Sequence, residues 1–130
     1  MELETIKGTI TAATAYVPPR RDLDEIQSLI SMARKTTPTY FFADLNARHR
    51  LFGCNDNSNM GKALEELIRR NILTHLGPEF KTFITRAHAT NPDIALGNRF
   101  AHLIITIQQG PITTSDHIPM YCILGYQQSL

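Results

Sequence analysis

Residues 39–46 read Thr-Tyr-Phe-Phe-Ala-Asp-Leu-Asn, and this stretch decides the fold that we expect. Residues 39–42 are β-favouring and mostly apolar, which predicts a short buried strand. The strand runs into Asp44 and Asn46. Their side chains point to the same side of an extended chain, because side chains alternate with a period of two. The stretch therefore predicts a buried strand that carries two polar groups at its end.

Two interpretations of this polar pair are open. A carboxylate beside an amide can orient a water molecule and hold a phosphate oxygen, as hydrolysis of a phosphodiester requires. Asp and Asn are also common where a strand ends in a turn. Residue type alone does not decide whether Asp44 and Asn46 form a catalytic site or belong to a turn.

On the N-terminal side, residues 5–17 predict a strand with an interruption at Gly8. The strand stops at Pro18-Pro19, since proline cannot donate to a ladder. Asp22 is a candidate N-cap for a helix that continues to Ala33 and ends before Pro38.

On the C-terminal side, the apolar spacing of residues 60–71 predicts a second helix after an Asn-rich loop. Short strands are expected at residues 72–74, 80–86, 92–96, 102–108 and 118–124. Strands mixed with two helices indicate an α/β or α+β fold, with a mixed sheet covered on one face by helices.

A second polar pair, Asp116-His117, precedes the last expected strand. A carboxylate beside an imidazole can fix its tautomer and raise its basicity. Neighbouring side chains on a strand face opposite ways, so Asp93 is the more natural partner for His117. The alternatives are a surface turn for Asp116-His117 and an exposed carboxylate at a strand start for Asp93.

Composition limits the class of protein. The 130 residues are enough for one domain, and 42% hydrophobic with 19% charged residues is typical of a soluble globular protein. A net charge of +1 gives no general attraction to nucleic acid, so DNA binding needs a local patch. Arg48 and Arg50 could touch phosphates or simply be solvated.

The two distant cysteines indicate a reduced protein, and no stretch is apolar enough for a membrane span. We expect an intracellular protein, cytoplasmic or nuclear.

Taken in order, four segments resemble one family. They are Ala15-Tyr16-Val17-Pro18-Pro19, then Ala43-Asp44-Leu45-Asn46-Ala47-Arg48-His49, then Pro92-Asp93-Ile94-Ala95-Leu96, and finally Ser115-Asp116-His117-Ile118-Pro119. The set is similar to the endonuclease/exonuclease/phosphatase superfamily, in particular the apurinic-like endonuclease domain of jockey-type non-LTR retrotransposons. The resemblance spans nearly the whole chain, with Ala43 in place of the usual glycine and Leu45 in place of phenylalanine.

The resemblance implies a metal-dependent DNA endonuclease, with Mg²⁺ or Mn²⁺ as cofactor and DNA as partner. By match, Asp44 and Asn46 would act at the scissile phosphate. His117 would stabilise the charge of the transition state, and Asp93 would orient His117. Asp116 would be a metal ligand or orienting carboxylate. Tyr16 and Arg48 would contact phosphate.

The resemblance covers the C-terminal half of the family's domain. The preceding half supplies an asparagine and the glutamate that is the family's main metal ligand, and no segment of this chain resembles it. We therefore expect a single domain of residues 1–130 that holds a cation weakly and is weak or inactive alone. Half of a two-sheet sandwich would also expose an apolar sheet face. The alternative function is accordingly an interaction protein that uses this face for a protein partner or a homodimer.

Overall fold

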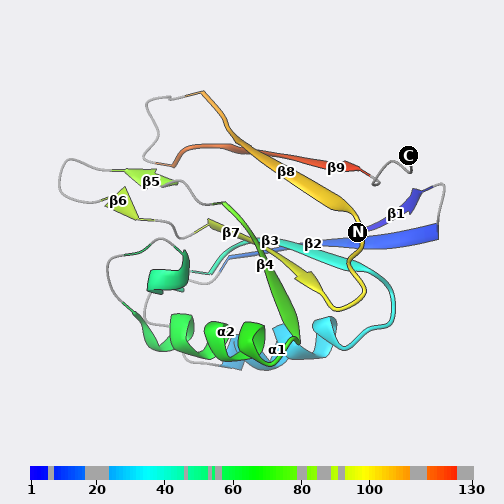
Figure 1. Ribbon diagram of the computed structural model, residues 1–130, viewed down its shortest axis with the longest axis horizontal. Helices are drawn as coiled ribbons and strands as arrows, with labels where there is room; N and C mark the ends of the chain where they lie inside the picture. The colour runs from blue at the N-terminus through cyan, green and yellow to red at the C-terminus, as the bar shows by residue number, and fades with distance from the viewer. Residues whose placement is uncertain are drawn as a thin grey trace.

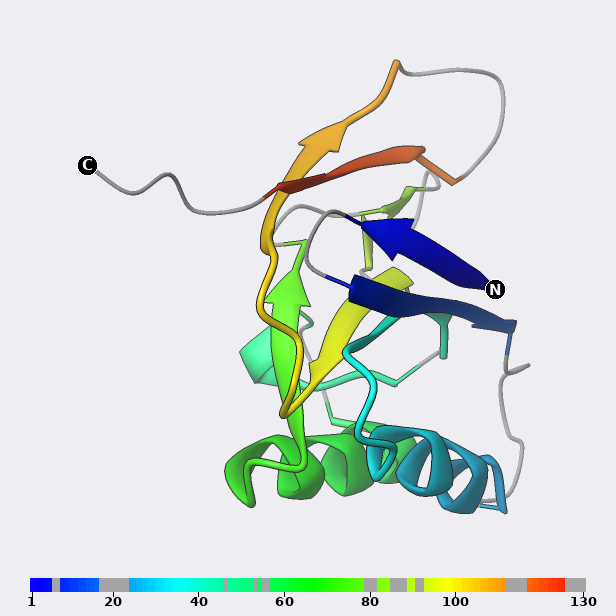
Figure 2. The same ribbon diagram turned by 90° about the vertical axis from the view of Figure 1, so that its right-hand side faces the viewer.

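The computed structural model describes residues 1–5, 8–16, 24–45, 47–52, 54, 57–78, 82–84, 89–90, 93–111 and 117–125. The described elements form three layers, as two perpendicular views show (Figure 1 and Figure 2). Two helices cover one face of a five-stranded sheet, and a two-stranded ribbon lies over the other face. The expected fold class, a mixed sheet covered by helices, is confirmed.

The helices are α1 (Asp24–Ala33) and α2 (Asn59–Arg69). The side chain of Ser58 caps α2 by accepting a hydrogen bond from the Gly61 N–H, and Leu64 and Leu67 are buried beneath the helix. The predicted cap of the first helix, Asp22, lies outside the described residues. Neither described helix has the length and hydropathy that a membrane crossing requires.

The five-stranded sheet has the order β1-β2-β3-β7-β4. Its strands are β1 (Glu2–Thr5), β2 (Gly8–Tyr16), β3 (Thr39–Asp44), β7 (Asp93–Asn98) and β4 (Leu73–Gly77). Only the β2–β3 pair is parallel, with α1 in its crossover, and the other three pairs are antiparallel. The sheet is therefore mixed, and β3 and β7 occupy its interior with both edges paired.

Alternation along β3 separates the core from the site. Phe41 and Ala43 belong to the buried cluster that includes Leu64 and Leu67 of α2, so they point to the helices. Tyr40 and Asp44 therefore point to the opposite face, where the ribbon lies. The Leu103 N–H donates to the Tyr40 hydroxyl at 2.6 Å, which ties the start of the ribbon to the sheet.

The ribbon consists of β8 (Ile104–Gln109) and β9 (Met120–Gly125), paired antiparallel. Alternate residues of β9 are half-buried, while Tyr121 and Ile123 between them are more than half exposed. Three short elements complete the fold: β5 (Phe83–Ile84), β6 (Ala89–Thr90) and the 3₁₀ turn η1 (Arg50–Phe52). None of the described strands outside this pair joins β8 or β9 in a ladder.

The bounds of three predicted strands differ from those in the structure. Of the strand expected over residues 5–17, Gly8–Tyr16 forms β2, while Thr5 belongs to β1, which folds back and pairs antiparallel with β2. Gly8, where an interruption was expected, has a φ of 117° that suits glycine. β3 continues to Asp44, two residues beyond the strand expected over residues 39–42. Of the strand expected over residues 80–86, the described part forms a strand only at Phe83–Ile84.

Candidate functional site

Three functional candidates form a row across the end of the sheet. Tyr16 is the Cα partner of Asp44 in the β2–β3 pair, and Asp44 is the partner of Asp93 in the β3–β7 pair. Because paired residues share a face of the sheet, all three side chains start on the side away from the helices. The row therefore places a phenol and two carboxylates on adjacent strands, at one end of the sheet.

His117 is held near this row because residues 117 and 118 contact Phe83 of β5 and Thr82 just before it. It forms an isolated antiparallel bridge with Phe83, and the Ile118 N–H donates to the Thr82 carbonyl at 2.6 Å. The rings of Phe83 and His117 pack edge to face, with centroids 4.9 Å apart. The Thr82 hydroxyl also accepts a hydrogen bond from the Asp93 N–H, at 3.4 Å. Residues 82 and 83 thus hold His117 and Asp93 from one side.

The predicted partnership of His117 with Asp93 is visible in the structure. The Nδ1 atom of His117 lies 3.4 Å from Asp93 Oδ2, which is long for a hydrogen bond. In the tautomer that carries its proton on Nδ1, the ring donates to Asp93 and keeps a lone pair on Nε2. The Asp93 side chain is 20% exposed and that of His117 is 47% exposed, so the pair faces solvent.

The remaining predicted site residues divide into two groups. Asn46 and Asp116 lie outside the described residues. Tyr16 and Arg48 are described, and Tyr16 is 65% exposed at the end of β2. The main chain of Arg48 is fixed at the start of α2, where its N–H donates to the Ser58 hydroxyl and its carbonyl accepts from the Ser58 N–H. The phosphate contacts of Tyr16 and Arg48 stay predictions.

Thr82 and Phe83 were assigned no role from the sequence. Thr82 is completely buried although it is polar, and it supplies both its carbonyl and its hydroxyl to the site. A local signal for this role is absent from the sequence, because the contacts join residues that are 11, 34 and 36 positions apart. Both residues position the site rather than add a reactive group to it.

The described residues include a donor set for a divalent cation. Asp44, Asp93 and His117 each offer one ligand atom, and these three atoms lie within 4.8 Å of one another. Two carboxylates satisfy the preference of Mg²⁺ and Mn²⁺ for oxygen, and imidazole is a ligand that Mn²⁺ and later transition metals accept. The donor set therefore fits a divalent cation, with a nitrogen ligand that Mg²⁺ does not favour.

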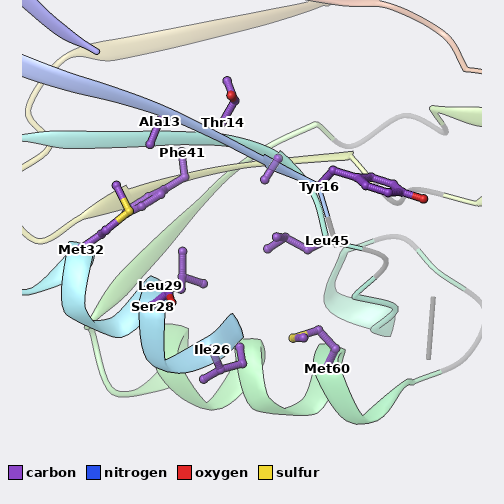
Figure 3. Close-up of a pocket in the computed structure, with 11 residues that line it drawn as sticks. Ala13, Thr14, Tyr16, Ile26, Ser28, Leu29, Met32, Phe41, Leu45 and Met60 are labelled. Atoms are coloured by element: carbon purple, nitrogen blue, oxygen red, sulfur yellow. The ribbon is translucent and has the colours of Figure 1, made fainter. Parts of the chain in front are cut away.

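A cavity of about 150 Å³ lies on the other side of β3. Figure 3 shows α1 and α2 side chains on one side of it and β3 side chains on the other, with Tyr16 pointing away from them. Ala43 and Leu45 line the cavity, and Asp44 between them starts on the opposite face of the strand. The cavity is therefore mostly apolar, and it meets the polar row only at Tyr16, which is among its lining residues.

Comparison with known proteins identifies the family. A sequence profile described as endonuclease-reverse transcriptase matches residues 10–121. The fold is similar to that of the endonuclease domain of TRAS1, a telomere-specific non-LTR retrotransposon, with a TM-score of 0.72 and 16% sequence identity. That match covers 98% of this chain and 63% of the TRAS1 chain. A search of curated protein sequences finds no match.

The chain belongs to the endonuclease-reverse transcriptase family, because the profile matches most of its length. The predicted resemblance to a non-LTR retrotransposon endonuclease is confirmed. The likeness to TRAS1 establishes the fold, and the chain spans less than two thirds of that structure.

Proposed function

We propose that the chain supplies part of a metal-dependent endonuclease site that hydrolyses phosphodiester bonds in DNA, and that alone it is a weak catalyst. The observation that carries the proposal is the convergence of Asp44, Asp93 and His117, whose ligand atoms lie within 4.8 Å of one another. These residues come from β3, from β7 and from the segment before β9. Phosphodiester hydrolysis needs a positioned water, a proton acceptor and positive charge near the phosphate oxygens.

Each side chain has a role that its position allows. Asp93 holds His117 by the Nδ1 contact at 3.4 Å, so that Nε2 can accept a proton from the attacking water. Asp44, next to Asp93 in the register, orients that water or protonates the leaving oxygen. The exposed phenol of Tyr16 donates a hydrogen bond to a neighbouring phosphate. A divalent cation, when bound, stabilises the negative charge that develops on the phosphate.

Weak catalysis follows from the small number of cation ligands. While His117 acts as the proton acceptor, Mg²⁺ has only the two carboxylates as protein ligands in this solvent-facing site, and it stays mostly hydrated, since it keeps several waters and dehydrates reluctantly. The sheet also presents no strong positive field, because the whole chain has a net charge of +1. We therefore expect cleavage that is detectable only when protein exceeds DNA.

The test is nicking of supercoiled plasmid with Mn²⁺ or Mg²⁺ under single-turnover conditions. The wild-type chain should convert plasmid slowly to the open circle, and His117→Gln should lose about 100-fold or more of that rate, as loss of a general base predicts. His102→Gln is the matched control, because His102 is an exposed histidine in the segment before β8, where its Nδ1 atom lies 3.2 Å from the Phe100 carbonyl oxygen.

Three results would contradict the proposal in different ways. Fast nicking with many turnovers would show that the site is complete in this chain. If an excess of protein does not nick the plasmid, the proposed catalytic role of Asp44 and His117 is wrong. Equal rates for the two histidine variants would assign any cleavage to a contaminating nuclease.

A second candidate function, self-association, is favoured by the ribbon. Tyr121 and Ile123 are 53% and 55% exposed on one face of β9, where they flank a half-buried Cys122. A two-stranded ribbon is marginally stable alone, and pairing with a second ribbon would cover this apolar face. In this proposal the chain acts as a homodimeric interaction protein, and the residues of the polar row have no catalytic role.

Light scattering at micromolar concentration tests self-association. A dimer is expected for the wild-type chain, and Ile123→Lys should shift it to the monomer by placing a charge in the paired face. Leu51→Lys is the control, because Leu51 is 64% exposed in η1, away from the ribbon. A wild-type chain that is monomeric at this concentration would contradict the proposal of self-association.

A further inference from the structure

The donor set at the end of the sheet has a chemical preference of its own. Asp44 and Asp93 are fixed opposite each other by the β3–β7 register, and His117 is held by its bridge to Phe83 and its contact with Asp93. Resting on the proposed function of these residues, we infer that they bind a transition-metal cation of the Zn²⁺ and Co²⁺ class in preference to Mg²⁺. We further infer that this cation inhibits the site.

The ligand atoms can meet on one such ion after a side-chain movement. Ligands on one tetrahedral cation at bonds of about 2.1 Å lie about 3.4 Å apart. The three atoms lie within 4.8 Å of one another, so the widest pair needs to close by up to about 1.4 Å. The His117 side chain is half exposed, so rotation of this side chain, rather than movement of the sheet, can bring its ring nitrogen to the cation.

The remaining coordination positions face solvent. Zinc sites that do chemistry have three protein ligands and an open position for water or substrate. The His117 side chain is 47% exposed and that of Asp93 is 20% exposed, so water can reach the cation from their side. Asp44, Asp93 and His117 thus resemble an open three-ligand site rather than a closed structural one.

Selectivity follows from the imidazole. Mg²⁺ demands oxygen ligands in a near-ideal octahedron, and replacing one oxygen with the His117 nitrogen loses part of its binding energy. Zn²⁺ and Co²⁺ accept nitrogen and oxygen together, and they stand above Mn²⁺ in the affinity order of divalent metals. The chain should therefore bind Zn²⁺ far more tightly than the Mg²⁺ that would support cleavage.

Inhibition follows from the same nitrogen. An imidazole binds a metal through the lone pair of a ring nitrogen, and the same lone pair accepts a proton in general-base catalysis. His117 cannot use one lone pair for both purposes. Metal binding through His117 and proton transfer by His117 are therefore mutually exclusive, whereas Mg²⁺ held by the two carboxylates alone leaves the His117 lone pair for the proton.

The experiment measures binding without DNA. Metal-free chain with Cys122→Ser, which removes the half-buried thiol as a competing ligand, is titrated with Co²⁺ by visible absorption and with Zn²⁺ by calorimetry. We expect one tight site whose Co²⁺ bands persist in a hundredfold excess of Mg²⁺. His117→Gln and Asp93→Asn should each weaken binding by more than the 10–100-fold that loss of an outer-sphere partner costs. His102→Gln, which alters an exposed histidine in the segment before β8, should bind as the parent does.

The outcomes separate this inference from the proposed nuclease. Undiminished Zn²⁺ binding in both His117→Gln and Asp93→Asn, with native circular dichroism, would overturn the site. Displacement of Co²⁺ by equimolar Mg²⁺ would overturn the selectivity. Nicking that proceeds unchanged in saturating Zn²⁺ would overturn the inhibition. Tight Zn²⁺ binding by a chain that never nicks DNA would support the metal site and reject only the nuclease.

Discussion

Glycine at position 61 lets α2 lie directly against the chain that leaves the site. A Cβ atom added at Gly61 would lie 1.8 Å from the Arg48 carbonyl oxygen and 2.5 Å from its carbonyl carbon. Real Cβ contacts are essentially never shorter than 3.0 Å, so either α2 or the Arg48 main chain must shift by more than 1 Å. Since both contacts are to backbone atoms, a side-chain rotation cannot relieve them.

The expected effect of Gly61→Ala is the reverse of the usual one. Alanine in a helix is ordinarily more stable than glycine by about 0.5–1 kcal/mol. Here the overlap costs about 1–3 kcal/mol, as overpacking does elsewhere. The shift also strains two hydrogen bonds between Arg48 and Ser58, at 2.7 and 2.9 Å, which contribute about 1 kcal/mol each. The net prediction is a loss of about 2–4 kcal/mol in the free energy of unfolding.

Urea denaturation followed by circular dichroism measures this loss through the midpoint at constant m-value. Gly125→Ala is the matched control, because a Cβ at Gly125 meets no atom within 4 Å. The control should be neutral or slightly more stable, since alanine restricts the unfolded chain. A Gly61→Ala protein as stable as the wild type would refute the close approach of α2 to Arg48, and with it the anchoring of the segment after β3.

Three further predictions concern the frame of the site. Asn98→Ala should lower the free energy of unfolding by about 2–4 kcal/mol, because the buried Asn98 side chain makes four hydrogen bonds to main-chain groups. Asn57→Ala is the control in the same urea assay, and it should lower that free energy by less than about 1 kcal/mol, because the exposed Asn57 side chain accepts one hydrogen bond, from the Arg50 N–H. Tyr40→Phe should lose about 1–2 kcal/mol by leaving the Leu103 N–H without its acceptor, and an unchanged thermal midpoint would argue against the tie between ribbon and sheet. Burial raises the pKa of the Cys122 thiol above its ordinary 9.0, so a Cys54→Ser chain at pH 8 should react with iodoacetamide more slowly when folded than in urea. Because the pKa is higher in the folded state, the Cys122 thiol also makes the native state less stable as the pH rises above 9.0. Equal alkylation rates would contradict that shift.

The sequence predicted the components of the site better than the contacts between them. Asp44, Asp93 and His117 were selected by residue chemistry and by their order along the chain. Their proximity depends on the antiparallel β3–β7 register, which joins residues about fifty positions apart. Local patterns do not encode such a register, since a slip of one residue would preserve both strands and move Asp93 to the helix face.

The errors in the predicted strands have a local physical cause. Residues 5–17 are rich in β-favouring side chains on both sides of Gly8, so propensity alone predicts one long strand. The φ of 117° at Gly8 turns the chain back, and the hydroxyl of Thr5 donates to the Gly8 carbonyl at 2.6 Å to close the turn. A glycine inside a β pattern indicated an interruption but did not reveal that β1 would fold back on β2.

The geometry of the polar row needs only contacts within this chain. Asp44 and Asp93 are held by two interior strands, and His117 is held by the Phe83 bridge and the Thr82–Ile118 hydrogen bond. None of these contacts requires the part of the TRAS1 fold that this chain does not match. Cation binding at the row and catalysis by it are therefore separable properties. The proposed cation binding depends on three donors that the chain already positions, and the proposed catalysis depends on how firmly the two carboxylates can retain a hard cation such as Mg²⁺ beside DNA. A measured preference for Zn²⁺ together with weak nicking in Mg²⁺ would follow from this one arrangement.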